Sequence, residues 1–356
     1  MSKASGMYYM PETPAKKVCD EGDFIFAAVG LDHGHIYGMS KGLIEAGGLI
    51  KWVYDPDPLK VEEFRKVFPQ VKVACSIDEV LMDSSVHLVA SAAIPSERCN
   101  IGLKAMEAGK DYFADKPPMT TMEQLEKAKE TVQRTKRKYM VYYGERLHNE
   151  ASVYAGQLVQ NGEIGRVLQV IGLGPHREGK GRPAWFYEKD KFGGILCDIG
   201  SHQIEQFLFF TGAKDAKVQA AKVANYNHKQ YPNFEDFGDV TLIADNGATG
   251  YFRVDWFTPD GLRTWGDGRL FILGTEGYIE IRKYIDITRD DNTDHVYLVN
   301  KAGEHYINVK GKVGFPFFGE LILDCLNRTE YAMTQEHVFK AIELALEAQN
   351  KAIKLE

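Results

Sequence analysis

Residues 24–38 read FIFAAVGLDHGHIYG, and this stretch decides the fold of the first half of the chain. The apolar run Phe24–Val29 predicts a buried strand, because it leaves no side of the strand for water. Gly30 and Gly34 mark a short turn, and a helical pattern follows over Tyr37–Ala46. Strand, turn and helix in this order predict the first β-α unit of a parallel sheet.

The same alternation of apolar runs and helical patterns continues to about residue 146. It is typical of a doubly wound parallel sheet covered by helices. The further strands are expected at Ile50–Tyr54, Val86–Ser91, Asp111–Ala114 and Tyr139–Tyr143, and the helices at Pro58–Val67, Ser76–Met82, Cys99–Ala108 and Met122–Thr135.

After about Arg146 the pattern changes to one helix, Ala151–Asn161, followed by β-rich segments and a closing helix, Glu336–Lys351. Turn signals such as Asp245-Asn246-Gly247 separate neighbouring segments, as in antiparallel hairpins. We therefore expect an arm (1–22), an α/β domain (23–145) and an α+β domain (146–356) with a large, mostly antiparallel open sheet. The expected strands are Val167–Leu173, Val218–Asn227, Val240–Ala244, Thr249–Phe257, Arg269–Leu273, Tyr278–Ile281 and His295–Val299.

The composition narrows the classes of partner. A net charge of −7 over 356 residues argues against a nucleic-acid-binding surface. The five cysteines are scattered, without a C-x-x-C pair, which indicates neither a disulfide framework nor a zinc site. No run approaches the roughly 18 apolar residues of a membrane span, and residues 1–22 do not resemble a signal peptide. We expect a cytoplasmic protein with a small-molecule ligand.

The turn after the first strand lies where a dinucleotide site directs backbone N–H groups at a pyrophosphate. Asp32 occupies the place of the second glycine of the usual G-x-G-x-x-G. Asp55 ends the second strand, about twenty residues beyond Gly34, where an acidic ribose ligand is expected. Its carboxylate would accept from both ribose hydroxyls and repel a 2′-phosphate, which favours NAD over NADP. Asp57 is an alternative ribose ligand, and the nearby Lys60 leaves NADP open.

Residues 193–202 read GGILCDIGSH and contain a candidate catalytic pair. Asp198 and His202 are four residues apart, one helical turn, so both would lie on one face. A carboxylate beside an imidazole can fix the tautomer of the ring and raise its basicity, as a general base requires. A satisfied structural histidine is the alternative. The second motif, ADKPP at residues 114–118, adds Lys116.

With the turn, Asp55, A-D-K-P and G-G-x-x-x-D-x-G-x-H in this order, the chain resembles the Gfo/Idh/MocA family. These are NAD(P)-dependent oxidoreductases of the glucose–fructose oxidoreductase and inositol dehydrogenase type. The resemblance extends from Phe24 to the end and includes AMEAGK (105–110), ILGTEGYIEI (272–281) and TQEHVFKAIELALEAQ (334–349). It implies an N-terminal Rossmann domain. Two pieces depart from the family pattern: Asp115-Lys116-Pro117 replaces E-K-P, and Ala93-Ile94-Pro95 replaces T-P-N.

The resemblance also implies roles for individual residues. Lys116 would lie beside the nicotinamide and the reacting hydroxyl, with Asp198 and His202 as its partners, and the peptide before Pro117 can be cis. His202 would accept the hydroxyl proton, Lys116 would stabilise the developing alkoxide, and Asp198 would orient the pair. The expected cofactor-binding residues are Gly30, Asp32, His33, Gly34, Asp55, Ala92, Ala93, Asp115 and Lys116.

A sugar-like substrate needs polar anchors and a flat apolar face. The expected substrate-binding residues are Arg146, His176, Arg177 and Trp185, with Tyr187, Trp256, Arg263, Trp265 and Asp267 as further candidates. A metal site at His33, His35 and His202 lacks supporting ligand spacing, so no metal is expected.

These features favour an NAD-dependent oxidoreductase that transfers a hydride between the nicotinamide and a secondary alcohol of a sugar, cyclic polyol or sugar derivative. One alternative is an NAD-dependent glycoside-cleaving enzyme that uses transient oxidation. Another is a non-catalytic NAD-binding regulator, against which the intact Lys116, Asp198 and His202 argue. Residues 250–257 are apolar or aromatic on both strand faces, which predicts a homodimer or homotetramer built through this sheet.

Overall fold

The structure, a computed structural model, describes residues 5–356, and these residues form two compact units. The parallel-sheet unit comprises residues 7–142 and 314–339. The open-sheet unit comprises the described residues up to Gly6, residues 143–313 and residues 340–356. The largest differences from the boundaries expected from the sequence are residues 7–22 and 314–339, which both belong to the parallel-sheet unit.

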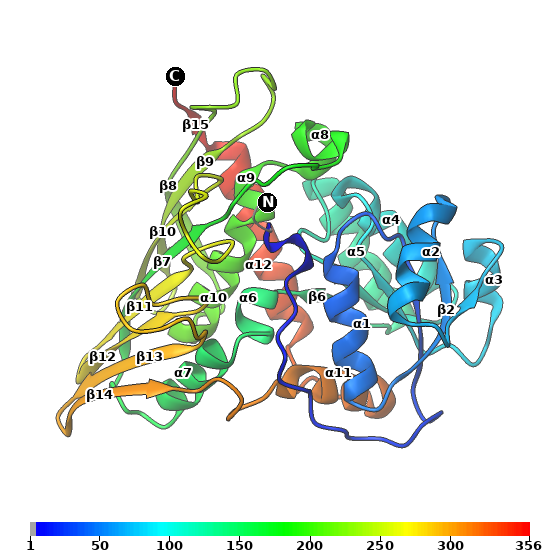
Figure 1. The fold of residues 1–356 in the computed structure, drawn as a ribbon, viewed down its shortest axis with the longest axis horizontal. Coiled ribbons are helices and arrows are strands. Elements are labelled where there is room, and N and C mark those ends of the chain that lie inside the picture. The colour runs from blue at the N-terminus through cyan, green and yellow to red at the C-terminus, as the bar shows by residue number, and fades with distance from the viewer. Residues whose placement is uncertain (1–4) are drawn as a thin grey trace. The chain divides into compact units, whose positions relative to one another are not determined.

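Six parallel strands form the sheet of the first unit, in the order β3-β2-β1-β4-β5-β6 (Figure 1). The doubly wound parallel sheet expected from the sequence is confirmed. The strand order reverses between β1 and β4, which is where such sheets bind ligands at the carboxyl ends of their strands. The strands are β1 (Ile25–Val29), β2 (Leu49–Tyr54), β3 (Lys72–Val73), β4 (Leu88–Ser91), β5 (Asp111–Asp115) and β6 (Tyr139–Tyr142).

Helices of this unit begin where side chains can accept the first free N–H groups. Thr121 and Ser76 accept from the backbone N–H groups of Gln124 and Glu79, as N-cap residues do. One helix begins four residues earlier than expected, at Pro95, because proline fits the first turn of a helix. The helices are α1 (His35–Glu45), α2 (Pro58–Val67), α3 (Ile77–Met82), α4 (Pro95–Glu107), α5 (Met122–Thr135) and α11 (Pro316–Asn327).

The chain before β1 follows helix α1 closely. Lys41 Nζ donates to the carbonyl of Pro11 at 3.0 Å, and the backbone N–H of Val18 donates to Ala46 at 2.9 Å. At the start of α1, a Cβ on Gly34 would lie 2.5 Å from both the carbonyl of Met7 and the ring of Tyr8. Gly34 therefore gives this segment the space to approach.

The open-sheet unit contains nine strands in the order β14-β13-β12-β11-β7-β10-β9-β8-β15. Most neighbours are antiparallel; β7 with β10 and β8 with β15 are the parallel pairs. The strands are β7 (Val167–Pro175), β8 (Ala216–Ala224), β9 (Phe237–Ala244), β10 (Thr249–Asp255), β11 (Arg269–Gly274), β12 (Gly277–Arg282), β13 (His295–Asn300), β14 (Gly303–Asn308) and β15 (Ile353–Lys354). The helices of this unit include α6 (Gly144–Leu147), α7 (Glu150–Gln160), α8 (Lys189–Phe192), α9 (Ile195–Asp198) and α10 (Gly200–Thr211), and α12 (Gln335–Lys351) joins it from Lys340.

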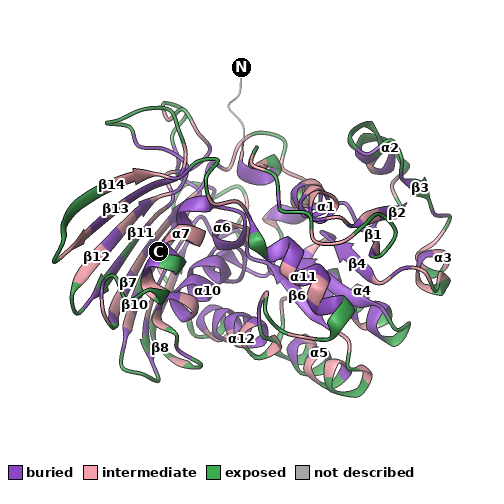
Figure 2. Ribbon diagram, turned by 90° about the horizontal axis from the view of Figure 1, so that it is seen from below, coloured by how far each residue is buried: buried purple, intermediate pink, exposed green. Residues whose placement is uncertain are grey.

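One face of this sheet carries helices and the other is open. Helix α10 packs on β7, β9 and β10, and α7 packs on β12 and β13 (Figures 1 and 2). Side chains such as Phe252 and Ile272 are buried in this unit. The strand register places Tyr251, Phe271 and Leu273 on the open face, where they are 37%, 37% and 39% exposed.

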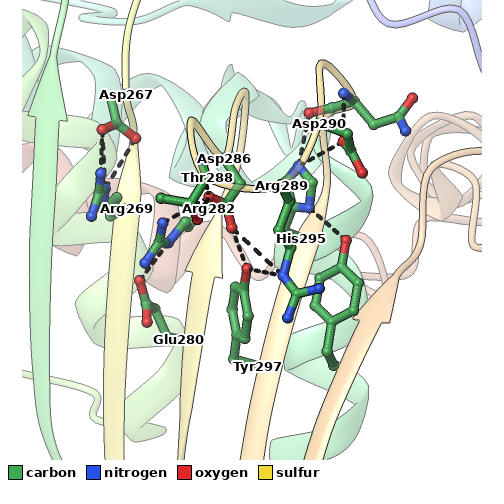
Figure 3. Close-up of polar contacts among 12 residues, drawn as sticks. Asp267, Arg269, Glu280, Arg282, Asp286, Thr288, Arg289, Asp290, His295 and Tyr297 are labelled. Atoms are coloured by element: carbon green, nitrogen blue, oxygen red, sulfur yellow. Dashed lines mark hydrogen bonds and ion pairs between the residues drawn. The ribbon is translucent and has the colours of Figure 1, made fainter.

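A cluster of charged and aromatic side chains covers the end of the open face near β11–β13 (Figure 3). Its arginines each contact a carboxylate within the unit. Arg269 pairs with Asp267 at 2.5 Å, and Arg282 Nη1 lies 3.0 Å from Asp286. The charges of this end are therefore largely balanced internally. Within the described part of the chain, no helix has the length and apolar character to cross a membrane.

Candidate active site

The turn after β1 is hydrogen-bonded to the carboxyl end of β2 and to the segment that follows β4. Gly30 has a φ of +71°, and a Cβ there would lie 2.6 Å from Cβ of Ala93. The backbone N–H of Ala92 donates to Gly30, and that of His33 donates to Ala92, at 3.0 and 2.9 Å. Glycine is therefore required at position 30 by its left-handed backbone and by the close approach of β4.

Asp55 is the buried acid at the end of β2. Its Oδ2 accepts from the backbone N–H of Leu31 at 2.7 Å, and its Oδ1 accepts from Asp57 at 2.9 Å. Burial raises the pKa of Asp55, although the two hydrogen bonds from the backbone N–H groups lower it in part. Asp57 instead caps α2, because its side chain accepts from the backbone N–H of Leu59. Of the two aspartates, the structure places Asp55 against the turn.

Asp115, at the end of β5, collects contacts from the histidines of the turn. His35 Nδ1 lies 2.8 Å from its Oδ1, and His33 Nδ1 lies 3.3 Å from its Oδ2. The backbone N–H of Lys116 also donates to Asp115 Oδ1. Burial alone would raise the pKa of Asp115, but contact with His35 and Arg98 holds it well below its usual value. These bonds fix the carboxylate and the backbone that carries Lys116.

Arg98, on α4, fixes the same segment, and the sequence analysis missed it. Its Nη2 lies 3.0 Å from Asp115 Oδ2, and its Nη1 donates to the carbonyls of Lys116 and Pro117 at 2.5 and 3.0 Å. The side chain is 1% exposed. The Lys116–Pro117 peptide is cis, as the resemblance allows. Arg98 thus holds the backbone on both sides of this peptide.

The ligand atoms of His33, His35 and Asp115 lie within 4.8 Å of one another, a spacing that could suit a cation. The contacts already made by these atoms describe a network of ion pairs and hydrogen bonds instead. Asp115 Oδ2 forms an ion pair with Arg98, while Oδ1 is hydrogen-bonded to His35 and to the backbone N–H of Lys116. A buried guanidinium 3.0 Å from the carboxylate would also repel a metal ion.

The residues of the turn fit a dinucleotide at two points. Asp55 offers a fixed carboxylate for ribose hydroxyls. Internal bonds take the backbone N–H groups of Leu31, His33 and His35, but among the described residues none takes those of Asp32 and Gly34. These two N–H groups remain as donors for a pyrophosphate at the start of α1.

In the open-sheet unit, two glycines open the segment that carries Asp198 and His202. Gly193 and Gly194 have φ values of +89° and +93°, and a Cβ on Gly194 would lie 2.3 Å from the side chain of Gln349. Asp198 and His202, expected on one face one helical turn apart, belong to two successive helices, because α9 ends at Asp198 and α10 begins at Gly200. His202 is 3% exposed.

A buried carboxylate, Glu145, lies near His202, and the sequence analysis missed it. Its Oε2 accepts from Lys283 Nζ at 2.8 Å and from Gln203 Nε2 at 2.9 Å. Burial alone would raise the pKa of Glu145, but Lys283, His202 and His176 lower it. Its Oε1 is buried, accepts no hydrogen bond from the described residues and lies 3.9 Å from His176 Nε2.

Two glycines of β7 explain how this carboxylate is held. A Cβ on Gly172 or Gly174 would lie 2.2 or 2.9 Å from the side-chain amide of Gln203. The space above these glycines lets Gln203 lie flat on the strand and reach Glu145. The alternation in IGLGP was therefore a signal for a side chain packed against the sheet.

The four residues expected to bind substrate differ in the contacts that they make within the protein. The ring of His176 contacts Trp265 and Trp256, with centroids 4.7 and 5.5 Å apart. Arg146 is bound by Glu205 at 2.5 Å, and Arg177 donates to two carbonyls of the 259–262 loop. Both guanidinium groups thus make internal contacts. Trp185 is 8% exposed.

Family models match both parts of the chain. The oxidoreductase family with an NAD-binding Rossmann fold matches residues 30–143, and the GFO/IDH/MocA C-terminal domain matches residues 153–280. Together they cover more than half of the chain. The protein therefore belongs to the GFO/IDH/MocA oxidoreductase family, and the resemblance seen in its sequence is confirmed.

Individual relatives agree with this assignment. A protein from Erwinia carotovora atroseptica, described as a candidate oxidoreductase, has a crystal structure with a TM-score of 0.92 and 53% identity, covering 94% of this chain and all of that one. The scyllo-inositol 2-dehydrogenase (NAD(+)) of Bacillus subtilis is 29% identical over 69% of this chain and 70% of that enzyme. The D-xylose dehydrogenase of Paenarthrobacter nicotinovorans is 26% identical over 57% and 52%. The chain thus spans between about half and 70% of the lengths of these two enzymes.

Proposed function

We propose that the protein is an NAD-dependent dehydrogenase that oxidises a secondary alcohol of a sugar, a cyclic polyol or a sugar derivative. The observation that carries the proposal is the arrangement at the carboxyl ends of the parallel strands. There, Asp55 faces the turn after β1, and Asp115 and Arg98 fix the backbone of Lys116. Relatives named as inositol and xylose dehydrogenases support the class of substrate.

Each of the proposed catalytic residues has its own role in the oxidation. When bound, the dinucleotide supplies a nicotinamide that accepts a hydride from the alcohol carbon. His202 accepts the hydroxyl proton as general base. The Lys116 ammonium donates to the same oxygen and stabilises its developing negative charge. Asp198 orients these two groups. Lys116 belongs to one unit and His202 and Asp198 to the other, so the proposal requires the three to meet over the substrate.

The charges around Asp55 support NAD as the preferred dinucleotide. Asp55 and Asp32 bring two carboxylates to the turn, and Lys60 brings one ammonium. The local sum is therefore negative, which favours ribose hydroxyls and disfavours a 2′-phosphate.

Glu145 and His176 support a substrate rich in hydroxyl groups. Glu145 Oε1 is a buried acceptor held in place through Oε2, and His176 is backed by two tryptophan rings. An ionised carboxylate oxygen that accepts no hydrogen bond from the described residues favours a hydrogen-bond donor such as a sugar hydroxyl. We propose that both side chains contact the substrate.

A crystal structure with NADH tests the arrangement. The proposal expects the Lys116 and His202 side chains to approach within about 8 Å, since both must reach one hydroxyl at hydrogen-bond distance. A wider separation with the dinucleotide bound would contradict it.

A further inference from the structure

Asp32 and Lys60 form an ion pair at the edge of the expected adenosine-ribose position. Lys60 Nζ lies 2.6 Å from Asp32 Oδ1 and 3.7 Å from Asp55 Oδ1. The second oxygen of Asp32 accepts from the backbone N–H of Ile94 at 3.2 Å. Asp32 is thus anchored on the segment that follows β4, while Lys60 extends from α2 between two carboxylates.

The charge of Lys60 is directed mainly at Asp32. Burial alone would lower the pKa of Lys60, but its hydrogen bond and ion pair with Asp32 raise it. The side chains of Lys60 and Asp32 are 35% and 13% exposed. Water therefore screens this pair less than a fully exposed one. Asp55, 1% exposed, contributes the second negative charge.

A 2′-phosphate would have to compete for this ammonium. The ribose hydroxyls of NAD can donate to Asp55 without disturbing the pair. The 2′-phosphate of NADP would place about two further negative charges beside Asp55. To neutralise them, Lys60 would have to leave Asp32, and the Asp32 carboxylate would then lose its counter-ion.

We propose that Asp32 determines the choice between NAD and NADP by holding Lys60 away from the 2′-phosphate position. This inference rests on the proposed dinucleotide site and adds its specificity determinant. Asp32 stands in the turn at the place of the second glycine, where the backbone approaches the pyrophosphate. In this chain its carboxylate acts on the ribose end through Lys60.

The test is the ratio of the dissociation constants of NADPH and NADH, measured by fluorescence titration at low ionic strength without any substrate. In Asp32→Asn, the amide oxygen can still accept from Ile94, while the charge that holds Lys60 is gone. We expect the ratio to fall at least about tenfold, mainly through tighter binding of NADPH. Thermal melting shows whether the variant keeps its fold.

Two further variants make the result specific. The double variant Asp32→Asn/Lys60→Met should return the ratio to at least the wild-type value, because the freed ammonium is removed. Glu63→Gln removes the same charge from α2, but Glu63 pairs with Lys66, so the ratio should stay unchanged. An unchanged ratio in folded Asp32→Asn, or a low ratio that persists in the double variant, would overturn the inference while leaving the dinucleotide site intact. Wild-type protein that binds neither NADH nor NADPH would refute the site itself.

Discussion

Lys283 Nζ lies 2.8 Å from Oε2 of Glu145, and both side chains are buried, at 1% and 4% exposure. The two residues are 138 positions apart in the chain, so the fold alone brings them together. Removing one partner of such a pair usually costs about 3–5 kcal/mol, because the other charge stays buried. The pair therefore fixes where the remaining oxygen of Glu145 lies.

The first prediction concerns Glu145→Gln. Lys283 and Gln203 both donate to Oε2, so the amide oxygen of the new side chain should take that place and its NH2 group the place of Oε1. An acceptor for substrate hydroxyls thereby becomes a donor. We expect KM for the polyol to rise about tenfold or more, with NADH affinity unchanged.

The matched control is Glu205→Gln on helix α10, which weakens another buried ion pair, that of Glu205 with Arg146. It should lower the melting temperature to a similar degree and leave KM nearly unchanged. Equal KM values for wild type and a folded Glu145→Gln variant would remove Glu145 from the substrate contacts.

The second prediction concerns pH and His33. Burial and the neighbouring His35 hold the pKa of His33 well below its usual value of roughly 6.5. Between the folded and unfolded pKa values the unfolded chain binds the extra proton, so acidification favours unfolding. As the pH falls below about 6.5, His33 should remove up to about 1.4 kcal/mol of stability per pH unit.

Urea unfolding between pH 7 and pH 5 measures this slope in wild type and in His33→Asn. The Asn oxygen can replace Nδ1 as acceptor for the backbone N–H of His35. The variant should lose part of the slope, whereas His305→Asn, at an exposed histidine of β14, should keep it. Identical slopes in wild type and His33→Asn would show that His33 titrates normally.

The third prediction concerns assembly. Tyr251 on β10 and Phe271 and Leu273 on β11 flank strand β7 on the open sheet face. The charges at the end of this face are already paired (Figure 3). We expect a second copy to cover these apolar side chains and form a homodimer or homotetramer. Phe271→Glu should shift the mass seen by light scattering toward the 40.1 kDa monomer.

Tyr331→Glu provides the control, since Tyr331 is an exposed aromatic residue of the parallel-sheet unit, and it should leave the mass unchanged. A wild-type protein that is monomeric at micromolar concentration would contradict the expected assembly.

The sequence predicted the elements whose patterns are local. Pro58–Val67 and Met122–Thr135 match the observed helices residue for residue, because the proline, the capping residues and the periodicity that define a helix can all be read from the local sequence. Helix α11 (Pro316–Asn327) was missed, since most of its residues are apolar and such a run does not by itself distinguish a buried helix from a buried strand. The packing of residues 7–22 along α1 rests on hydrogen bonds that this segment makes through its backbone, and these leave no pattern in its sequence.

The site residues that belong to a sequence motif could be predicted. Those whose role depends on being buried in the fold could not. Asp55 and Lys116 stand in recognisable positions after strands. Arg98 and Glu145 do not, because their roles come from partners far along the chain and from the absence of water around them. Such charges resemble surface residues in the sequence, and only the fold shows that they are enclosed.

Reduction of NAD by a panel of cyclic polyols, monosaccharides and glycosides, followed through NADH absorbance, tests the central claim most directly. Wild-type protein should produce NADH with at least one compound. His202→Ala should lower kcat about 10²–10⁴-fold with NAD affinity nearly unchanged, because the imidazole acts on the substrate. Lys116→Ala should also lower kcat. Wild-type protein that binds NAD but reduces it with no compound, or a His202→Ala variant with wild-type turnover, would contradict the account.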